Sequence, residues 1–115
     1  MSPADVHARL VSIFPEFAGC WDSPNNYFRE SDGTFTVWSV FAQFSHYFRE
    51  HFASFSGSVL SALARFIDEC MASPGTDIDN ATATCFLENL AGHHSAAVLS
   101  PFLGRAAQDF LSQYV

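Results

Sequence analysis

The sequence predicts an all-α fold, a single-domain bundle of about five helices that spans residues 1–115. Three observations support this prediction. Apolar residues recur every three or four positions through most of the chain, which is the spacing of one face of a helix. Short stretches rich in glycine, proline, serine and asparagine separate these periodic segments. At 115 residues, of which 49% are hydrophobic, the chain has the size and composition of one ordinary domain with its own core.

The first helix is expected from Pro3 to about Phe14. Ser2 can cap it, because serine side chains accept hydrogen bonds from the unpaired amides of a first turn. Pro3 suits the first helical position, and the charge of Asp5 is favourable at the positive N-terminal end of a helix. Pro15 then ends the helix or begins a short turn.

Residues 15–34 are the least regular part of the chain. They combine many turn-forming residues with four large aromatic ones: Phe17, Trp21, Tyr27 and Phe28. A loop of twenty residues is unusual in a compact domain unless it packs down or has a function. We therefore expect short helical turns within it.

Aromatic residues dominate the second predicted helix, which runs from about Thr34 to Ala53. Those at helical spacing form one stripe: Trp38, Phe41, Phe44, Phe48, Phe52 and Phe55. A strand would require strict alternation of apolar and polar residues, which this run lacks. We assign the stripe to the core, whereas Phe35 and Tyr47 fall to the side and stay available for other contacts.

Three more helices follow. The third is expected over residues 58–71 and ends at a Ser-Pro-Gly turn. The fourth begins at a cap within residues 76–79 and runs to about residue 91, before a glycine that suits a helix end. The last runs over residues 100–113, and residues 95–99 can extend it with a kink at the proline.

The charge balance limits the possible partners. The net charge is −7, lysine is absent, and all five basic residues are arginines. Direct binding of nucleic acid or of an anionic membrane is disfavoured, because both need a basic surface. A basic protein partner fits this charge, although the charge also serves to keep a small apolar-rich protein dispersed. No apolar run reaches the roughly 18–20 residues of a membrane span, and the N-terminus lacks the pattern of a signal peptide, so we expect a cytoplasmic location.

Motifs for metal binding or catalysis are lacking. The zincin motif needs two histidines four residues apart, but His46 and His51 are five apart and lie on different helical faces. Glu50 can share a site with His46, yet two ligands do not make a metal site. We expect no metal, no cofactor and no enzymatic activity, since no nucleophile or phosphate motif is present. A pair formed by Cys85 and His93 stays open, with a buried structural cysteine as the favoured interpretation.

Three acidic residues have competing interpretations. Glu88 is either a solvated edge residue or a half-buried carboxylate paired with Arg65 or Arg105, and we favour the pair because buried charges need partners. Asp77 and Asp79 precede or open the fourth helix. One of them is expected to cap it, which leaves the other available for contact.

Two short patterns carry a family resemblance. N-x5-F-L-E-N-L at residues 80–90 and L-V-x-I-F-P-E-F at residues 10–17, together with the aromatic-rich middle helix, resemble small all-helical bacterial proteins that look like immunity proteins encoded beside secreted polymorphic toxins. The resemblance implies that the protein neutralises a cognate toxin by binding it. It carries over no catalytic residues.

The leading hypothesis is therefore a cytoplasmic immunity protein. It would bind the toxin domain of a secreted effector, such as one of a type VI or contact-dependent system, and occlude its active site through an acidic surface. Toxins that act on nucleic acids or nucleotides need a basic cleft, which an acidic protein suits. The expected contacts are aromatic anchors and exposed acids: Trp21, Asp22, Tyr27, Glu30, Asp32, Asp77 and Asp79. The alternative is a small-ligand-binding or regulatory domain, in which the aromatic residues line a pocket with His46 and Glu50.

Overall fold

In the computed structural model, the described residues, 1–26, 28, 30 and 32–114, form helices and turns and contain no strand. The all-α class expected from the sequence is confirmed. The helical segments exceed the five expected and are α1 (Pro3–Ile13), α2 (Phe17–Trp21), α3 (Val37–His51), a 3-10 turn (Phe52–Ser54), α4 (Gly57–Cys70), α5 (Asp77–Ala81), a π-helical segment (Thr82–Leu87), α6 (Glu88–Leu90), α7 (His94–Leu99), a second 3-10 turn (Ser100–Phe102) and α8 (Arg105–Ser112).

The start of α1 is the one that the sequence predicts. The Ser2 hydroxyl accepts a hydrogen bond from the Asp5 amide (3.1 Å), and the Asp5 carboxylate accepts one from the Ser2 amide (2.9 Å). Hydrogen bonds from the backbone and side chain of Ser2 lower the pKa of the Asp5 carboxyl, because they favour its ionised form. This reciprocal capping satisfies two amides of the chain at the helix end and sets where α1 begins.

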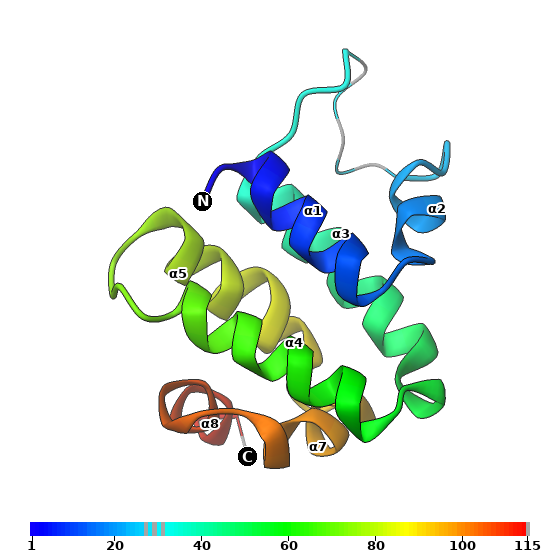
Figure 1. The fold of residues 1–115 in the computed structure, drawn as a ribbon. Coiled ribbons are helices and arrows are strands. Elements are labelled where there is room, and N and C mark those ends of the chain that lie inside the picture. The colour runs from blue at the N-terminus through cyan, green and yellow to red at the C-terminus, as the bar shows by residue number, and fades with distance from the viewer. Residues whose placement is uncertain (27, 29, 31, 115) are drawn as a thin grey trace.

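The aromatic stripe of α3 forms the centre of the core. Phe41, Phe44 and Phe48 are fully buried, as predicted. The ring of Phe44 lies 5.2 Å from Phe17 on α2 and 5.3 Å from Phe86 in the π-helical segment, measured between centroids. Residues far apart in the sequence therefore meet on this one helix, which contacts both α1 and α5 and lies behind α1 in Figure 1.

Three aromatic predictions for this region are wrong. Trp38, assigned to the core, exposes 38% of its surface, whereas Tyr47, expected at the side, exposes only 5% and lies 5.5 Å from Phe17. Phe35 is also packed, with its ring 5.0 Å from Trp21. The physical reason is that α2 and the chain after it cover a flank of α3, so the buried face is wider than one stripe. Trp38 lies in the first turn of α3 and reaches beyond these covering elements.

The fourth predicted helix contains a π-helical segment that the sequence did not indicate. Four of the five buried residues of this predicted helix form two adjacent pairs, Ala81 with Thr82 and Phe86 with Leu87, and the pairs are five residues apart; the fifth is Leu90. An α-helix of 3.6 residues per turn cannot hold both pairs on one face. The wider π turn, with its i to i+5 hydrogen bonds, brings both pairs to the side that contacts α3.

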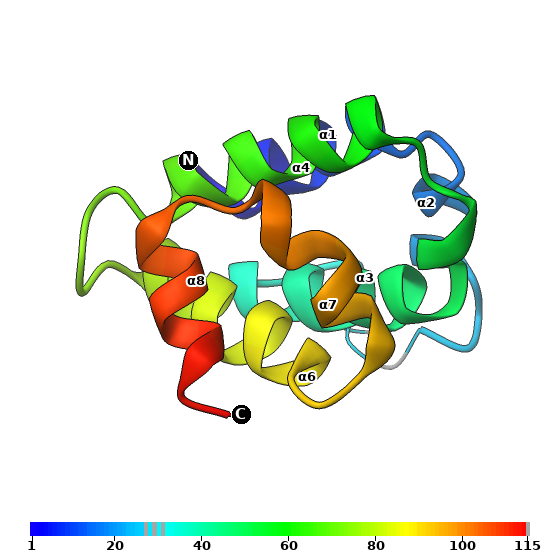
Figure 2. The same ribbon diagram turned by 90° about the horizontal axis from the view of Figure 1, so that it is seen from below.

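The last predicted helix is divided in two, and the break is not at Pro101. It falls at Leu103 and Gly104, between the second 3-10 turn and α8. The Gly104 amide donates a hydrogen bond to the carboxylate of Asp68 on α4 (3.1 Å), which turns the chain against α4. As a result α7 and α8 lie across α3 and α4 (Figure 2), rather than forming one continuous helix.

The close approach at Gly104 predicts a specific loss of stability. A Cβ atom there would lie 2.7 Å and 2.8 Å from the two carboxylate oxygens of Asp68, so the carboxylate must move and its hydrogen bond is lost. We expect Gly104→Ala to lower the free energy of unfolding by about 1–2 kcal/mol. Urea denaturation measures this difference.

The matched control is Gly19→Ala in α2, where an added Cβ meets nothing within 4 Å. Because alanine is the better helix former, this change should leave the stability equal or higher. Equal losses for the two variants would contradict the role given to Asp68.

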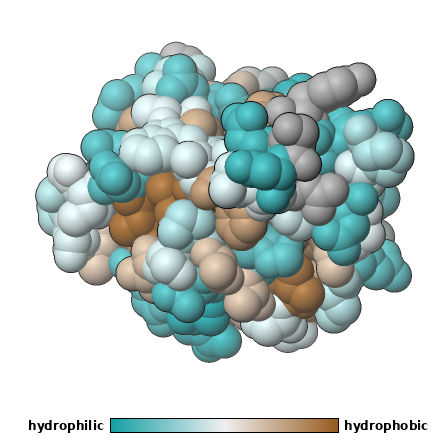
Figure 3. Space-filling view, turned by 90° about the horizontal axis from the view of Figure 1, so that it is seen from above, coloured by the Kyte–Doolittle hydropathy of each residue, from teal (hydrophilic) through white to brown (hydrophobic). Residues whose placement is uncertain are grey.

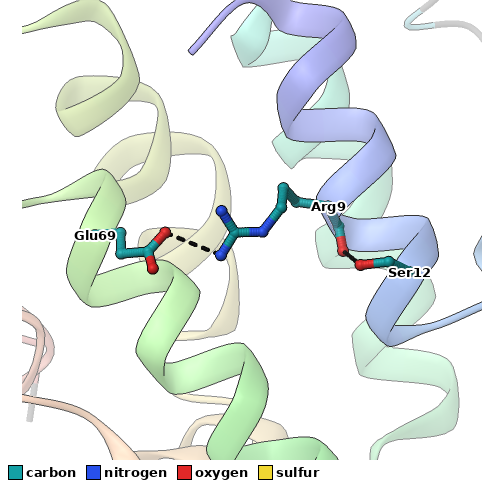
Figure 4. Close-up of polar contacts among 3 residues, drawn as sticks. All are labelled: Arg9, Ser12 and Glu69. Atoms are coloured by element: carbon teal, nitrogen blue, oxygen red, sulfur yellow. Dashed lines mark hydrogen bonds and ion pairs between the residues drawn. The ribbon is translucent and has the colours of Figure 1, made fainter.

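α1 and α4 lie side by side near one end of the molecule. Their packing includes an ion pair between Arg9 on α1 and Glu69 on α4, with Nη2 and Oε2 2.9 Å apart (Figure 4). We call the end that carries Met1, the start of α3 and the α4–α5 connection the upper end; it lies at the upper left of Figure 1, with the α4–α5 connection at the left edge. None of the helices in the described part of the chain is long and apolar enough to cross a membrane.

Candidate functional site

A groove of about 780 Å³ opens at the upper end, among the starts of α1, α3 and α5. We call it the upper groove. Figure 3 views the molecule from this end and shows brown, hydrophobic atoms in a hollow bordered by paler and teal, more hydrophilic ones. The residues that line the groove are Met1, Pro3, Phe35, Thr36, Val37, Trp38, Glu69, Cys70, Ser73, Gly75, Thr76, Asp77 and Ile78.

Local capping interactions set the two sides of the groove. On one side the hydroxyl of Thr36 accepts a hydrogen bond from the Ser39 amide (3.2 Å) and begins α3. On the other side the hydroxyl of Thr76 accepts one from the Asp79 amide (3.3 Å) and begins α5. Gly75 precedes this cap with φ of +83°, a conformation that glycine adopts without strain. The first turns of α3 and α5 therefore form the two sides of the groove.

The apolar part of the groove includes two exposed side chains, Trp38 and Met1. Behind them lie the partly buried Phe35 and Ile78 and the buried Cys70. Burial raises the pKa of the Cys70 thiol to about 12, so this cysteine is an inert part of the wall. Sequence periodicity missed Trp38 as a site residue. The sequence did contain a hint of its exposure: Trp38 comes two residues after the capping Thr36, and side chains in the first turn of a helix have fewer neighbours that can cover them.

Carboxylates border the same groove. Asp77 is exposed in the first turn of α5, and no side-chain hydrogen bond or ion pair joins it to another described residue. Glu69 is engaged by Arg9 (Figure 4). The expectation that Asp77 or Asp79 caps this helix is wrong, because Thr76 is the cap. The Asp79 carboxylate instead accepts a hydrogen bond from the Gly75 amide (2.9 Å). Asp77 is the acid left available for contact.

Two predicted acids lie on the connection that leads into the groove. Asp32 is exposed and accepts hydrogen bonds from the amide (2.9 Å) and hydroxyl (2.8 Å) of Thr34. These bonds lower the pKa of the Asp32 carboxyl, with the backbone bond as the larger cause. Glu30 is exposed, and its amide donates to the Thr34 carbonyl (3.0 Å). This turn therefore presents two carboxylates outward, one residue before Phe35 enters the groove.

The other residues predicted to contact a partner are Trp21, Asp22 and Tyr27, and the structure treats each differently. Trp21 is wrong as an interface anchor, because it is only 3% exposed and its carbonyl accepts a hydrogen bond from the buried Asn26 side chain (2.8 Å). The helical turn of α2 directs this ring inward, which a sequence lacking clear periodicity there did not reveal. Asp22 is exposed, as an interface residue must be. Tyr27 lies outside the described residues.

His7 packs against Trp21, with ring centroids 5.2 Å apart, and its buried Nε2 atom has no hydrogen-bond partner among the described residues. Burial lowers the pKa of His7, and the charge of Asp22 opposes this only in part. The unfolded chain therefore binds a proton at a higher pH than the folded one. We expect the free energy of unfolding to be fully retained above about pH 6.5 and to fall as the pH drops through and below that value.

Urea denaturation at a series of pH values measures this dependence. His7→Phe should flatten the slope below about pH 6.5, whereas His46→Gln, at an exposed position, should keep it. A His7→Phe variant with the slope of the unaltered protein would show that another group is responsible.

The described residues form no arrangement that supports a catalytic or metal site. No group of three or more His, Cys, Asp or Glu residues that could hold a metal occurs within the described residues. Nδ1 of His93 accepts a hydrogen bond from the Ser95 amide (3.1 Å) and so caps α7. The sulfur of Cys85 lies 3.8 Å from the hydroxyl of Thr84, and no described contact joins it to His93. All three cysteines are free thiols.

Glu88 also departs from its favoured interpretation. It is exposed, and within the described residues no ion pair links it to Arg65 or Arg105. The half-buried pair is therefore wrong. The π-helical segment before Glu88 rotates the following turn relative to an ideal α-helix, and this places Phe86 and Leu87 inside and Glu88 outside.

The aromatic pocket of the alternative hypothesis does not form around the stripe. Phe41, Phe44 and Phe48 pack on neighbouring rings in the core. Glu50 instead borders a polar hollow of about 580 Å³, of which His46 is not part. The lining residues are Glu16, Gly19, Cys20, Ser23, Asn25, Gln43, Tyr47, Glu50 and His51.

Comparison with known proteins gives one match. No curated protein and no solved structure matches the chain. A family model described as a domain of unknown function, DUF7674, matches residues 7–114. This match covers α1 from its second turn through α8, and so includes most of the upper groove and the whole core. The chain belongs to the DUF7674 family.

Proposed function

We propose that this protein is an immunity protein that binds a cognate secreted toxin and blocks its active site with the upper end. The observation that carries the proposal is an apolar groove lined by the exposed Asp77 at the start of α5, together with two more exposed carboxylates, Glu30 and Asp32, on the connection that leads to Phe35 of the groove. Such a surface complements a basic cleft with an apolar wall.

The charge of the whole chain supports the same kind of partner. With a net charge of −7 and no lysine, the protein attracts basic surfaces over distances of several ångströms before contact. Enzymes that cleave nucleic acids or consume nucleotides carry basic clefts, because they must bind phosphates. We therefore propose a toxin of this class, and a role for the inhibitor in the cytoplasm, where the substrates of such a toxin are found.

The sequence resemblance supports the proposal independently of the surface. The patterns at residues 80–90 and 10–17 resemble immunity-type proteins encoded beside polymorphic toxins. In the structure these residues are mostly core or helix positions, so the resemblance concerns the fold rather than the contact surface. In this proposal the protein binds the toxin and covers its active site, and it catalyses no reaction.

The experiment is co-expression with the product of the adjacent gene in a bacterial host. Expression of that product alone should stop growth, and co-expression with this protein should restore it. The two proteins should co-purify as a stable complex. A neighbouring product that is harmless, or that is toxic and is neither bound nor neutralised, would overturn the proposal.

A further inference from the structure

We propose that the upper groove receives an arginine side chain of the partner, which lies against Trp38 and places its guanidinium at Asp77. This inference rests on the proposed function in one respect: it assumes that the groove is occupied by part of a protein. It adds the chemistry by which the groove selects that protein.

The chain itself contains the same type of contact a short distance away. The guanidinium of Arg9 lies 4.8 Å from the centroid of the Phe66 ring, and its Nη2 is 2.9 Å from the Glu69 carboxylate. Glu69 also lines the upper groove. An arginine that contacts both an aromatic ring and a carboxylate is therefore already present next to the groove; Figure 4 shows its contact with Glu69.

A second set of these groups, Trp38 and Asp77, lines the groove, and no arginine among the described residues pairs with this carboxylate. Trp38 offers an exposed aromatic surface, and Asp77 offers a carboxylate without a described side-chain partner. Tryptophan is the aromatic residue that attracts cations most strongly. Ile78 and Val37 provide apolar surface against which the methylene stem of an arginine can pack.

Other occupants fit the groove less well. An acidic peptide or an anionic lipid would meet Asp77 and a chain of net charge −7, which repel it. A purely apolar side chain would cover Asp77 without providing a hydrogen bond, and burying an unpaired charge is costly. A lysine supplies charge, but it lacks the planar group that both stacks on an aromatic ring and binds a carboxylate through two N–H groups.

The test uses short peptides, so that it does not depend on a toxin. The probe is the peptide Ac-Gly-Leu-Arg-Gly-amide, and its matched control has citrulline, a neutral isostere, in place of arginine. Each is titrated into the 15N-labelled full chain while the two tryptophan indole N–H signals are followed by NMR. Trp38 reports on the groove, and the buried Trp21 serves as an internal reference.

The arginine peptide should shift the Trp38 signal to saturation with a dissociation constant in the millimolar range, while Trp21 stays unchanged. The citrulline peptide should bind about tenfold more weakly, and the difference should shrink with added salt. Asp77→Asn should produce the same tenfold loss for the arginine peptide. Glu88→Gln, which removes an exposed charge elsewhere, should leave the affinity unchanged.

A second variant tests the aromatic contact. Trp38→Ala should weaken binding of the arginine peptide, as followed by the backbone amides of Val37 and Ile78. The control is Phe102→Ala, at a position with a similar exposed fraction of 39% outside the groove. If Trp38→Ala does not fold, the Asp77→Asn comparison still decides the question.

Three results would overturn the inference: no saturable shift of Trp38, equal binding of the citrulline peptide, or full affinity in Asp77→Asn. A Trp38 signal that shifts on dilution of the protein alone, without any peptide, would instead show that a second copy of the chain fills the groove, and this result would also overturn the inference. Failure of the toxin co-expression experiment with intact peptide binding would reject the immunity function alone.

Discussion

Replacing Phe44 by alanine is expected to lower the free energy of unfolding by about 3–5 kcal/mol, which is a large part of the stability of a domain this size. Phe44 is fully buried, and its ring lies between Phe14 at the end of α1 (5.1 Å) and Phe86 in the π-helical segment (5.3 Å). Removing the ring leaves a cavity where elements far apart in sequence meet. The surrounding rings can close it only in part.

Guanidinium chloride denaturation of the purified variant measures the loss. The control is Trp38→Ala on the same helix, six residues earlier, at a position that is 38% exposed. It removes a larger side chain, and we expect it to cost less than half as much because much of that side chain contacts water in the folded state. Equal losses at the two positions would contradict the assignment of Trp38 to a surface groove. If Phe44→Ala does not fold, Phe44→Leu should show a smaller but measurable loss in the same direction.

Reversing two charges at the upper end should slow association with the toxin by at least about tenfold at low ionic strength. The variant is Glu30→Lys with Asp77→Lys. Both acids are exposed, and neither side chain makes a hydrogen bond to another described residue, so the change alters the surface field without removing a turn or a cap. The effect should decrease as salt is added, because screening weakens attraction between exposed charges.

Stopped-flow or biolayer measurements at several salt concentrations give the association and dissociation rate constants. The charge-matched control is Glu88→Lys with Asp109→Lys, which changes the net charge equally at positions on α6 and α8. This control should slow association much less, because it leaves Glu30 and Asp77 at the upper end unchanged. If the two variants slow association equally, the net charge of the chain and not the upper end steers the partner.

Several parts of the fold could be predicted from local sequence. The start of α1, with its Ser2 cap and Pro3 in the first position, was predicted correctly because the interactions involve residues within one turn. The core positions of Phe41, Phe44 and Phe48 followed from helical spacing, which any amphipathic helix must show. Short turns in residues 15–34 were also expected, and α2 is one of them.

The candidate site could be predicted only in part. The exposed positions of Glu30, Asp32 and Asp77 agree with their proposed role, since charged residues seldom lie buried without a partner. Trp21 and Trp38 were assigned the wrong way round. Both are large aromatic residues on helices, and whether each is buried depends on which other segments lie over it.

By itself, the sequence determined the helical class, the starts of α1, α4 and α5, the central aromatic stripe and the acidic character of the chain, because each depends on spacing or composition within a few turns. Only the tertiary structure decided which rings are covered, where α8 begins and which acids border the groove. These depend on contacts such as Gly104 with Asp68, and Trp21 with His7, between residues brought together by folding. Periodicity shows that a helix has an apolar face, but the width of that face is set by the elements that pack against it.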